Sequence, residues 1–212
     1  MKMTGENKAE TIIKLLQKEY PHNKIALKFS DPLELLISTV LSAQCTDERV
    51  NKVTKILFGK YKNIDDYARA DFREFEQDIR PTGFYKNKAK NIISASQQII
   101  KRFNGKIPQT MEELLTLPGI GRKTANIILT FAFGKVDGIA VDTHVMRLSQ
   151  RLGLSKNNNA DRIEKDLMKI IPKKYWKDFN TLLVTHGRKV CLARRPFCEQ
   201  CILKHLCPSF KP

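Results

Sequence analysis

The chain has 212 residues, and its 38 lysines and arginines against 22 aspartates and glutamates give a formal net charge of +16. An apolar fraction of 42% is typical of a globular protein and excludes a disordered or fibrous chain. No apolar run approaches the roughly 20 residues of a membrane helix, and the N-terminus lacks a signal-peptide core. We therefore expect a cytoplasmic protein, nucleoid-associated if prokaryotic, with no membrane partner. The charge itself favours a polyanionic partner.

The basic residues are concentrated in two segments. Residues 81–106 contain six basic residues and no acidic residue, and residues 173–212 contain nine basic residues and two acidic ones. Residues 61–80, in contrast, contain more acidic than basic residues. Such clustering is typical of a binding surface for a polyanion, whereas a charge that serves solubility is spread evenly.

The spacing of apolar residues predicts helices along most of the chain and no alternating strand pattern, so the expected fold class is all-α. Asp31-Pro32 and Thr46-Asp47 are typical helix starts, and Asn104-Gly105 is a typical helix end. Thr110 and Glu113 form the pattern of a capping box. The expected helices span 8–20, 33–44, 47–59, 85–103, 122–133, 143–152, 160–171 and 173–186, with two short acidic segments at 64–70 and 72–79.

Leu117-Pro118-Gly119-Ile120-Gly121 is predicted to be a tight turn, because two glycines and a proline leave little side chain. It leads into a helix whose first amides lack intrahelical partners and, with the helix dipole, can bind a phosphate. On this pattern alone a plain connection between helices is an equally good interpretation. The loop lacks the length and spacing of a P-loop or a dinucleotide fingerprint, which argues against ATP or NAD.

Two stretches carry a resemblance to a known family. LPGIGRKTA (117–125) resembles the helix-hairpin-helix element of the base-excision DNA glycosylases, and IAVDTHV (139–145) is similar to the Gly/Pro-Asp loop of that superfamily. The similarity extends from LSAQCTD (41–47) through GFYKNKAKNI (83–92) to the last cysteine, and it is closest to the endonuclease III family.

The resemblance implies two helical domains that flank a DNA-binding cleft. A central domain, residues 25–135, would carry the helix-hairpin-helix motif. Residues 1–24 and 136–212 would together form a cluster domain with the catalytic aspartate and an iron–sulfur loop. The implied partner is double-stranded DNA that contains damaged bases or abasic sites, and we expect a monomer.

Lys123 lies in the first turn of the predicted helix after the hairpin. The dipole and partial burial both disfavour an ammonium there, and a neutral amine can attack an electrophilic carbon. Local rules alone favour a phosphate contact, but the resemblance implies that Lys123 is the nucleophile that attacks C1′ of the damaged nucleotide. Asp142 is an N-cap on local rules. The resemblance places it near the lysine, where it would help deprotonate the amine and stabilise positive charge on the sugar.

These implied roles describe an enzyme, a DNA glycosylase with apurinic/apyrimidinic (AP) lyase activity. It would remove oxidised pyrimidines through a lysine Schiff base and nick the strand by β-elimination. The nearest alternative is a monofunctional mismatch or adenine glycosylase of the same fold, against which Lys123 argues. A second alternative is a non-enzymatic nucleic-acid-binding protein with a structural zinc.

Four of the five cysteines form a C-x6-C-x2-C-x5-C pattern at Cys191, Cys198, Cys201 and Cys207. In a cytosolic chain this pattern favours a metal site over disulfides. Zinc normally takes two C-x2–4-C pairs and only one is present, whereas four clustered thiolates suit a [4Fe–4S] cluster. The spacing matches the iron–sulfur loop of the endonuclease III family without a gap. Cys45 lies outside the pattern and is expected to be a small buried residue.

A glycosylase that extrudes a base must also fill the gap that the base leaves. By resemblance, Gln44 is the plug that pairs with the orphaned base, and Phe84 is a second, apolar wedge. The alternatives are a helix C-cap for Gln44 and core packing for Phe84. The other expected DNA contacts are basic or hairpin residues: Lys86, Lys88, Gly119, Gly121, Arg122, Arg194 and Arg195.

Overall fold

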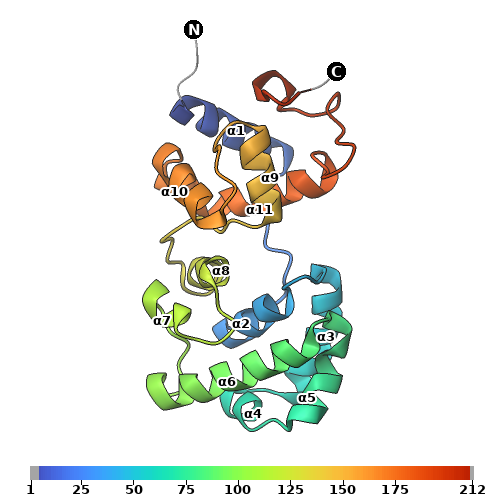
Figure 1. Ribbon diagram of the computed structural model, residues 1–212, viewed down its shortest axis with the longest axis vertical. Coiled ribbons are helices and arrows are strands. Elements are labelled where there is room, and N and C mark those ends of the chain that lie inside the picture. The colour runs from blue at the N-terminus through green and yellow to red at the C-terminus, as the bar shows by residue number, and fades with distance from the viewer. Residues whose placement is uncertain (1–4, 211–212) are drawn as a thin grey trace. The chain divides into compact units, whose positions relative to one another are not determined.

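The computed structural model describes residues 5–210 (Figure 1), and every regular element within them is a helix. The predicted all-α class is confirmed. None of the helices in this range is both long and apolar enough to cross a membrane. The α-helices are α1 (Gly5–Glu19), α2 (Pro32–Leu41), α3 (Asp47–Lys60), α4 (Ile64–Ala68), α5 (Phe72–Ile79), α6 (Tyr85–Phe103), α7 (Met111–Leu115), α8 (Arg122–Phe133), α9 (Thr143–Arg151), α10 (Ala160–Ile170) and α11 (Trp176–Lys189).

Side-chain caps begin several helices where the sequence predicts them. Asp31 and Thr46 accept hydrogen bonds from backbone amides in the first turns of α2 and α3. Thr110 caps α7 in the same way, through the amide of Glu113 at 3.3 Å. The Glu113 carboxylate accepts from the Thr110 hydroxyl at 3.0 Å, so within the described chain only the threonine half of the predicted capping box is formed.

Two predicted helix ends are wrong. α2 ends at Leu41, three residues before the predicted end at Gln44, because the amides of Ala43 and Cys45 donate three residues back, to Val40 and Ser42, in place of the α-helical pattern. Gln44 then has a left-handed φ of 53°, so the helix cannot resume there. The helix expected from residue 173 begins as a 3-10 turn, Lys173–Tyr175, and continues as α11 beyond the predicted end. Gln44 therefore lies in a turn between α2 and α3.

The chain forms two compact units, each with its own buried apolar core. One unit is Ile25–Lys135. The other contains the chain up to Lys24 together with the chain from Val136 onward. The hairpin and the four-cysteine segment therefore belong to different units.

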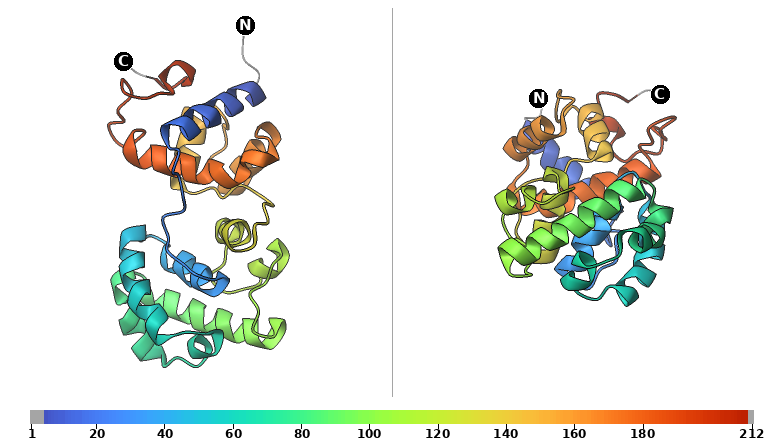
Figure 2. Two further views of the ribbon diagram at one scale, coloured as in Figure 1. Left: turned by 180° about the vertical axis from the view of Figure 1, so that it is seen from behind. Right: turned by 60° about the horizontal axis from the view of Figure 1, so that its bottom comes forward.

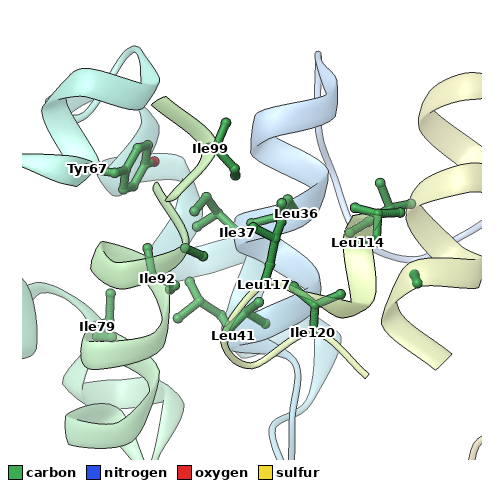
Figure 3. Close-up of a cluster of buried hydrophobic side chains, with 14 of the residues drawn as sticks. Leu36, Ile37, Leu41, Tyr67, Ile79, Ile92, Ile99, Leu114, Leu117 and Ile120 are labelled. Carbon is green, nitrogen blue, oxygen red and sulfur yellow. The ribbon is translucent and has the colours of Figure 1, made fainter. Parts of the chain in front are cut away.

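In the unit Ile25–Lys135, α6 packs against α2, α4 and α5, and α8 packs against α2 and α7. The hairpin contributes to this core through Leu117 and Ile120, which are both buried. Burial of each such side chain stabilises the folded state by roughly 1.5–3 kcal/mol. These two residues therefore anchor the hairpin to the core of this unit. Figure 3 shows the cluster, with Leu36, Ile37, Leu41, Tyr67, Ile79, Ile92, Ile99, Leu114, Leu117 and Ile120 labelled.

In the other unit, the N-terminal helix α1 packs with helices from the far end of the chain. It contacts α10 and α11, and α11 in turn packs against α9. Figure 2 shows the blue helix α1 beside the orange helix α11. Ile12 and Leu16 of α1 share one core with Leu148 and Phe179. The cysteine segment follows α11 directly and is attached to this core.

Candidate active site and cysteine loop

The hairpin is closed by its own backbone and held by its apolar residues. The amide of Ile120 donates to the Leu117 carbonyl at 3.2 Å, and both side chains point into the core. The exposed Gly121 is the N-cap of α8, and as a glycine it has no side chain with which to cap the helix. The first amides of α8 are therefore placed at an exposed turn, as a phosphate site requires.

Gly119 is required by both its backbone conformation and its surroundings. Its φ is +78°, which only glycine adopts readily. A Cβ at this position would lie 2.8 Å from Nδ2 and 2.9 Å from Cβ of Asn91 in α6. The hairpin and α6 can approach this closely because residue 119 has no side chain.

Replacing Gly119 by alanine is expected to lower the free energy of unfolding by about 1–3 kcal/mol, through backbone strain and the clash with Asn91. Urea unfolding measures this loss. Gly121→Ala is the matched control, because Gly121 has a φ of −96° and a Cβ there would meet nothing within 4 Å. Equal destabilisation by the two substitutions would contradict the expected role of the close approach.

Lys123 is the second residue of α8, and its side chain is exposed. The predicted partial burial is therefore wrong, because the buried residues of α8 begin only at Ala125. The helix dipole still acts on an amine in this first turn. Exposure leaves the amine accessible to a large substrate.

Asp142 belongs to the other unit and caps α9. Its Oδ1 accepts from the backbone amides of His144 and Val145, both at 2.8 Å. The N-cap interpretation is confirmed, and the two bonds hold the carboxylate in one orientation. The side chain remains half-exposed and so keeps access to solvent.

Gln44, Phe84 and Gly119 line one cavity of about 170 Å³. They come from three separate segments: the turn after α2, the residue before α6, and the hairpin. Gln44 is exposed, and Phe84 is 63% exposed with a left-handed φ of 49°. Core packing for Phe84 and a helix C-cap for Gln44 are therefore both wrong. The structure brings three of the predicted DNA-contact residues together.

Lys88 does not fit its predicted role as a DNA contact. Its side chain is only 4% exposed, and its ammonium donates to the carbonyls of Leu41 at 2.7 Å and Thr82 at 2.8 Å. Burial lowers the pKa of Lys88. Lys86 and Lys90, on the same helix, are exposed. Residue 88 faces inward because it lies one helical turn before the buried Ile92.

The side chains of Cys191, Cys198, Cys201 and Cys207 line one cavity of about 470 Å³. Within residues 5–210 no group of three or more His, Cys, Asp or Glu side chains is arranged to hold a metal ion. Burial, together with the neighbouring thiols, raises the pKa of Cys201 and Cys207. A metal bound in the cavity would favour their ionised form, because thiolates are the ligands that metals take.

Two arginines of α9 and a histidine of α11 hold this loop, and the sequence alone predicted none of these three contacts. Arg147 donates to the Cys191 carbonyl at 3.0 Å, and Arg151 donates to the Cys191 sulfur at 3.3 Å. His186 Nε2 lies 3.3 Å from the Cys201 sulfur. The i, i+4 spacing of the arginines indicates one helix face, but their partners lie in an irregular segment that no periodicity predicts.

Of the other predicted DNA contacts, Lys86, Arg194 and Arg195 are exposed, and Arg122 is half-buried. Arg194 and Arg195 lie between the first two cysteines of the loop, where Arg195 has a left-handed φ of 52°. The cysteine loop therefore presents two guanidinium groups to solvent.

Comparison with known proteins identifies the superfamily to which the chain belongs. Residues 37–173 match the family described as HhH-GPD superfamily base excision DNA repair protein. The chain is 53% identical to endonuclease III of Synechocystis sp. over 204 residues, 96% of this chain and 93% of that protein. It is 38% identical to endonuclease III of Escherichia coli over 203 residues, 95% and 96% of the two chains. The chain belongs to the HhH-GPD superfamily.

Two solved structures narrow this assignment. They are described as a non-covalent endonuclease III–DNA complex and a trapped endonuclease III–DNA covalent intermediate. Each matches with a TM-score of 0.93 at 45% identity and covers 98% of this chain and 97% of the other. Within its superfamily the chain is a member of the endonuclease III family, the base-excision repair DNA glycosylases with AP lyase activity. The predicted family and enzyme class are confirmed.

Proposed function

We propose that this enzyme removes oxidised pyrimidines from double-stranded DNA and nicks the strand at the resulting abasic site. It would act as a monomer in the cytoplasm, at the nucleoid if the source is prokaryotic. The observation that carries the proposal is Lys123, an exposed amine in the first turn of α8, directly after the anchored hairpin. A relative 45% identical to this chain has been trapped covalently on DNA.

Lys123 supplies the nucleophile in this scheme. Its ε-nitrogen bonds to C1′ of the damaged nucleotide while the glycosidic bond breaks and the base leaves. Opening of the sugar ring then converts the C1′–N bond into a Schiff base. Loss of a proton from C2′ breaks the bond between C3′ and its phosphate oxygen, which nicks the strand. The Asp142 carboxylate assists by accepting the lysine proton and by stabilising positive charge on the sugar.

The other predicted DNA contacts, apart from Lys88, would hold and open the duplex. Gly119, Gly121 and Arg122 would bind a phosphate at the start of α8. Gln44 would fill the space of the extruded base and pair with its orphaned partner, while Phe84 would act as a wedge. The exposed basic side chains that would contact flanking phosphates are Lys86, Arg194 and Arg195.

Borohydride reduction tests the covalent step. A duplex with one oxidised pyrimidine should yield a stable enzyme–DNA adduct and a strand nick without alkali. A monofunctional glycosylase would release the base, give no adduct and leave a site that breaks only on alkaline heating. That second outcome, on a duplex from which the base is released, would overturn the proposal.

We infer further that the four cysteines hold a [4Fe–4S] cluster. Four thiols on one cavity of about 470 Å³ match the ligand set that such a cluster needs. Arg151, which donates to the Cys191 sulfur, and His186, whose Nε2 lies 3.3 Å from the Cys201 sulfur, are typical of residues that orient thiolate ligands. When bound, the cluster would tie the ends of this loop together and leave Arg194 and Arg195 exposed.

The purified protein is expected to contain iron and inorganic sulfide in about equal amounts. Cys198→Ser should lose the cluster and make the loop sensitive to trypsin after Arg194, because its ends are no longer held; Arg195 precedes Pro196, and trypsin does not cleave that bond. Cys45→Ser is the matched control, since Cys45 packs against the core of the other unit. Zinc without sulfide in the wild-type protein would contradict the inference.

A further inference from the structure

We propose that Lys88 is a positioning residue that holds the turns of Gln44 and Phe84 in place beside the hairpin. The proposal rests on the proposed function of these two side chains as plug and wedge. Lys88 itself is buried and touches no DNA in this scheme. It acts through the backbone of the two turns.

A single ammonium joins the two segments that carry the plug and the wedge. Lys88 Nζ donates to the carbonyl of Leu41, the last residue of α2 and three residues before Gln44. It also donates to the carbonyl of Thr82, two residues before Phe84. The Leu41 carbonyl lies at the negative end of α2, where a cation is stabilised and where carbonyls lack helical partners. Lys88 therefore fixes where both turns begin.

Both turns contain the backbone conformation that most needs support. Gln44 and Phe84 have φ values of 53° and 49°, although neither is glycine. Such conformations are unfavourable for residues with a side chain and persist only where the surroundings hold them. The residues themselves are exposed, so their own side chains contribute little burial. Backbone hydrogen bonds close each turn, from the Cys45 amide to the Ser42 carbonyl and from the Gly83 amide to the Arg80 carbonyl. The two Lys88 bonds add a restraint that links the turns to each other, because they fix the carbonyls on the N-terminal sides of Gln44 and Phe84.

The same face of α6 also supports the hairpin. Asn91 lies one turn after Lys88 and contacts Gly119, and Asn87, Lys88 and Asn91 all line the cavity of about 170 Å³. The start of α6 thus contacts all three segments that would meet the extruded nucleotide. A buried ammonium costs solvation energy that an apolar side chain of the same length would avoid. Because the Lys88 ammonium bonds to carbonyls of two separate segments, we infer that it positions those segments.

A double-mutant cycle tests this role by following base extrusion with 2-aminopurine placed beside the lesion. Lys88→Met removes the charge and both bonds at nearly constant length. We expect it to slow extrusion about tenfold, a typical size for the loss of a coupled positioning contact. The Gln44→Ala/Phe84→Ala variant should be slowed to a similar extent. Adding Lys88→Met to that variant should change the rate less than about twofold, because the residues through which Lys88 acts are gone.

Three further variants complete the design. Lys88→Arg keeps the charge and should recover part of the extrusion rate. Lys90→Met removes an exposed lysine of the same helix and should leave the rate unchanged. If Lys88→Met does not fold, Lys88→Gln, which keeps a hydrogen-bond donor, takes its place in the cycle.

The outcomes separate the two proposals. Wild-type extrusion by the Gln44→Ala/Phe84→Ala variant would overturn the plug and wedge roles, whatever Lys88 does. If that variant is impaired, wild-type extrusion by Lys88→Met would overturn the positioning role. The positioning role would also be overturned if Lys88→Met slowed extrusion by the same factor in the Gln44→Ala/Phe84→Ala variant as in the wild type. Independent rate losses of this kind are expected of general destabilisation.

Discussion

Lys123→Gln is expected to abolish the borohydride-trapped adduct and to slow base release by roughly 10³- to 10⁶-fold, the range seen when a nucleophile is removed. The amide nitrogen of glutamine is not nucleophilic, so no bond to C1′ and no Schiff base can form. Single-turnover base release and adduct yield are the measurements. Because Lys123 is exposed, its loss should change the free energy of unfolding by less than about 0.5 kcal/mol.

A measurement of DNA affinity distinguishes the two possible roles of Lys123, a nucleophile or a lysine that only contacts phosphate. Lys123→Gln should still bind a duplex with an uncleavable abasic analogue, with an affinity within about tenfold of the wild type, since one phosphate contact carries a modest share of the binding energy. Lys86→Gln is the matched control, because it removes another exposed lysine of the same unit and should leave adduct formation intact. An adduct that survives Lys123→Gln would show that another amine performs the reaction.

Local signals in the sequence were sufficient to predict where most of the helices lie. Both α6 and α8 begin and end where periodicity, the Asn104-Gly105 stop and the hairpin predict them. The early end of α2 had no such signal, because a left-handed residue that is not glycine leaves no mark in the sequence. The hairpin prediction succeeded because two glycines and a proline within five residues favour a tight turn. The burial of Leu117 and Ile120, which anchors this turn, was not predicted from the sequence.

Lys88 was wrongly assigned although the sequence held the necessary signal. It lies in a basic segment, which favours an exposed, DNA-facing interpretation. Helical spacing, however, puts residue 88 on the same face as Ile92 and Ile99, both buried. Periodicity was the better guide here, because charge in a segment says nothing about which face each residue occupies.

The cysteine loop shows where prediction from one sequence ends. The spacing of the four cysteines predicts that they act together, and the structure places all four on one cavity. The partners of these cysteines, Arg147, Arg151 and His186, lie 15 to 40 or more positions away and could not be paired with them by any local rule. Contacts of this kind depend on tertiary packing, which one sequence does not encode in a readable pattern.

Asp142 combines a structural and a proposed chemical role, and two substitutions separate them. Asp142→Asn keeps an oxygen that can accept from the amides of His144 and Val145, because asparagine caps helices as well as aspartate does. It removes only the charge. We expect stability within about 0.5 kcal/mol of the wild type and base release slower by about 10²- to 10⁴-fold, the usual contribution of a positioned acid or base.

Asp142→Ala removes both the charge and the cap. It should lose the same activity as Asp142→Asn and, in addition, about 1 kcal/mol of stability, measured by urea unfolding. Asn159→Ala is the matched control: Asn159 caps α10 through the amide of Arg162, so its loss should cost similar stability and no activity. If Asp142 were only a cap, Asp142→Asn would be fully active and Asp142→Ala would behave like Asn159→Ala. Loss of activity in Asp142→Asn without loss of stability is therefore the result that assigns the charge to catalysis.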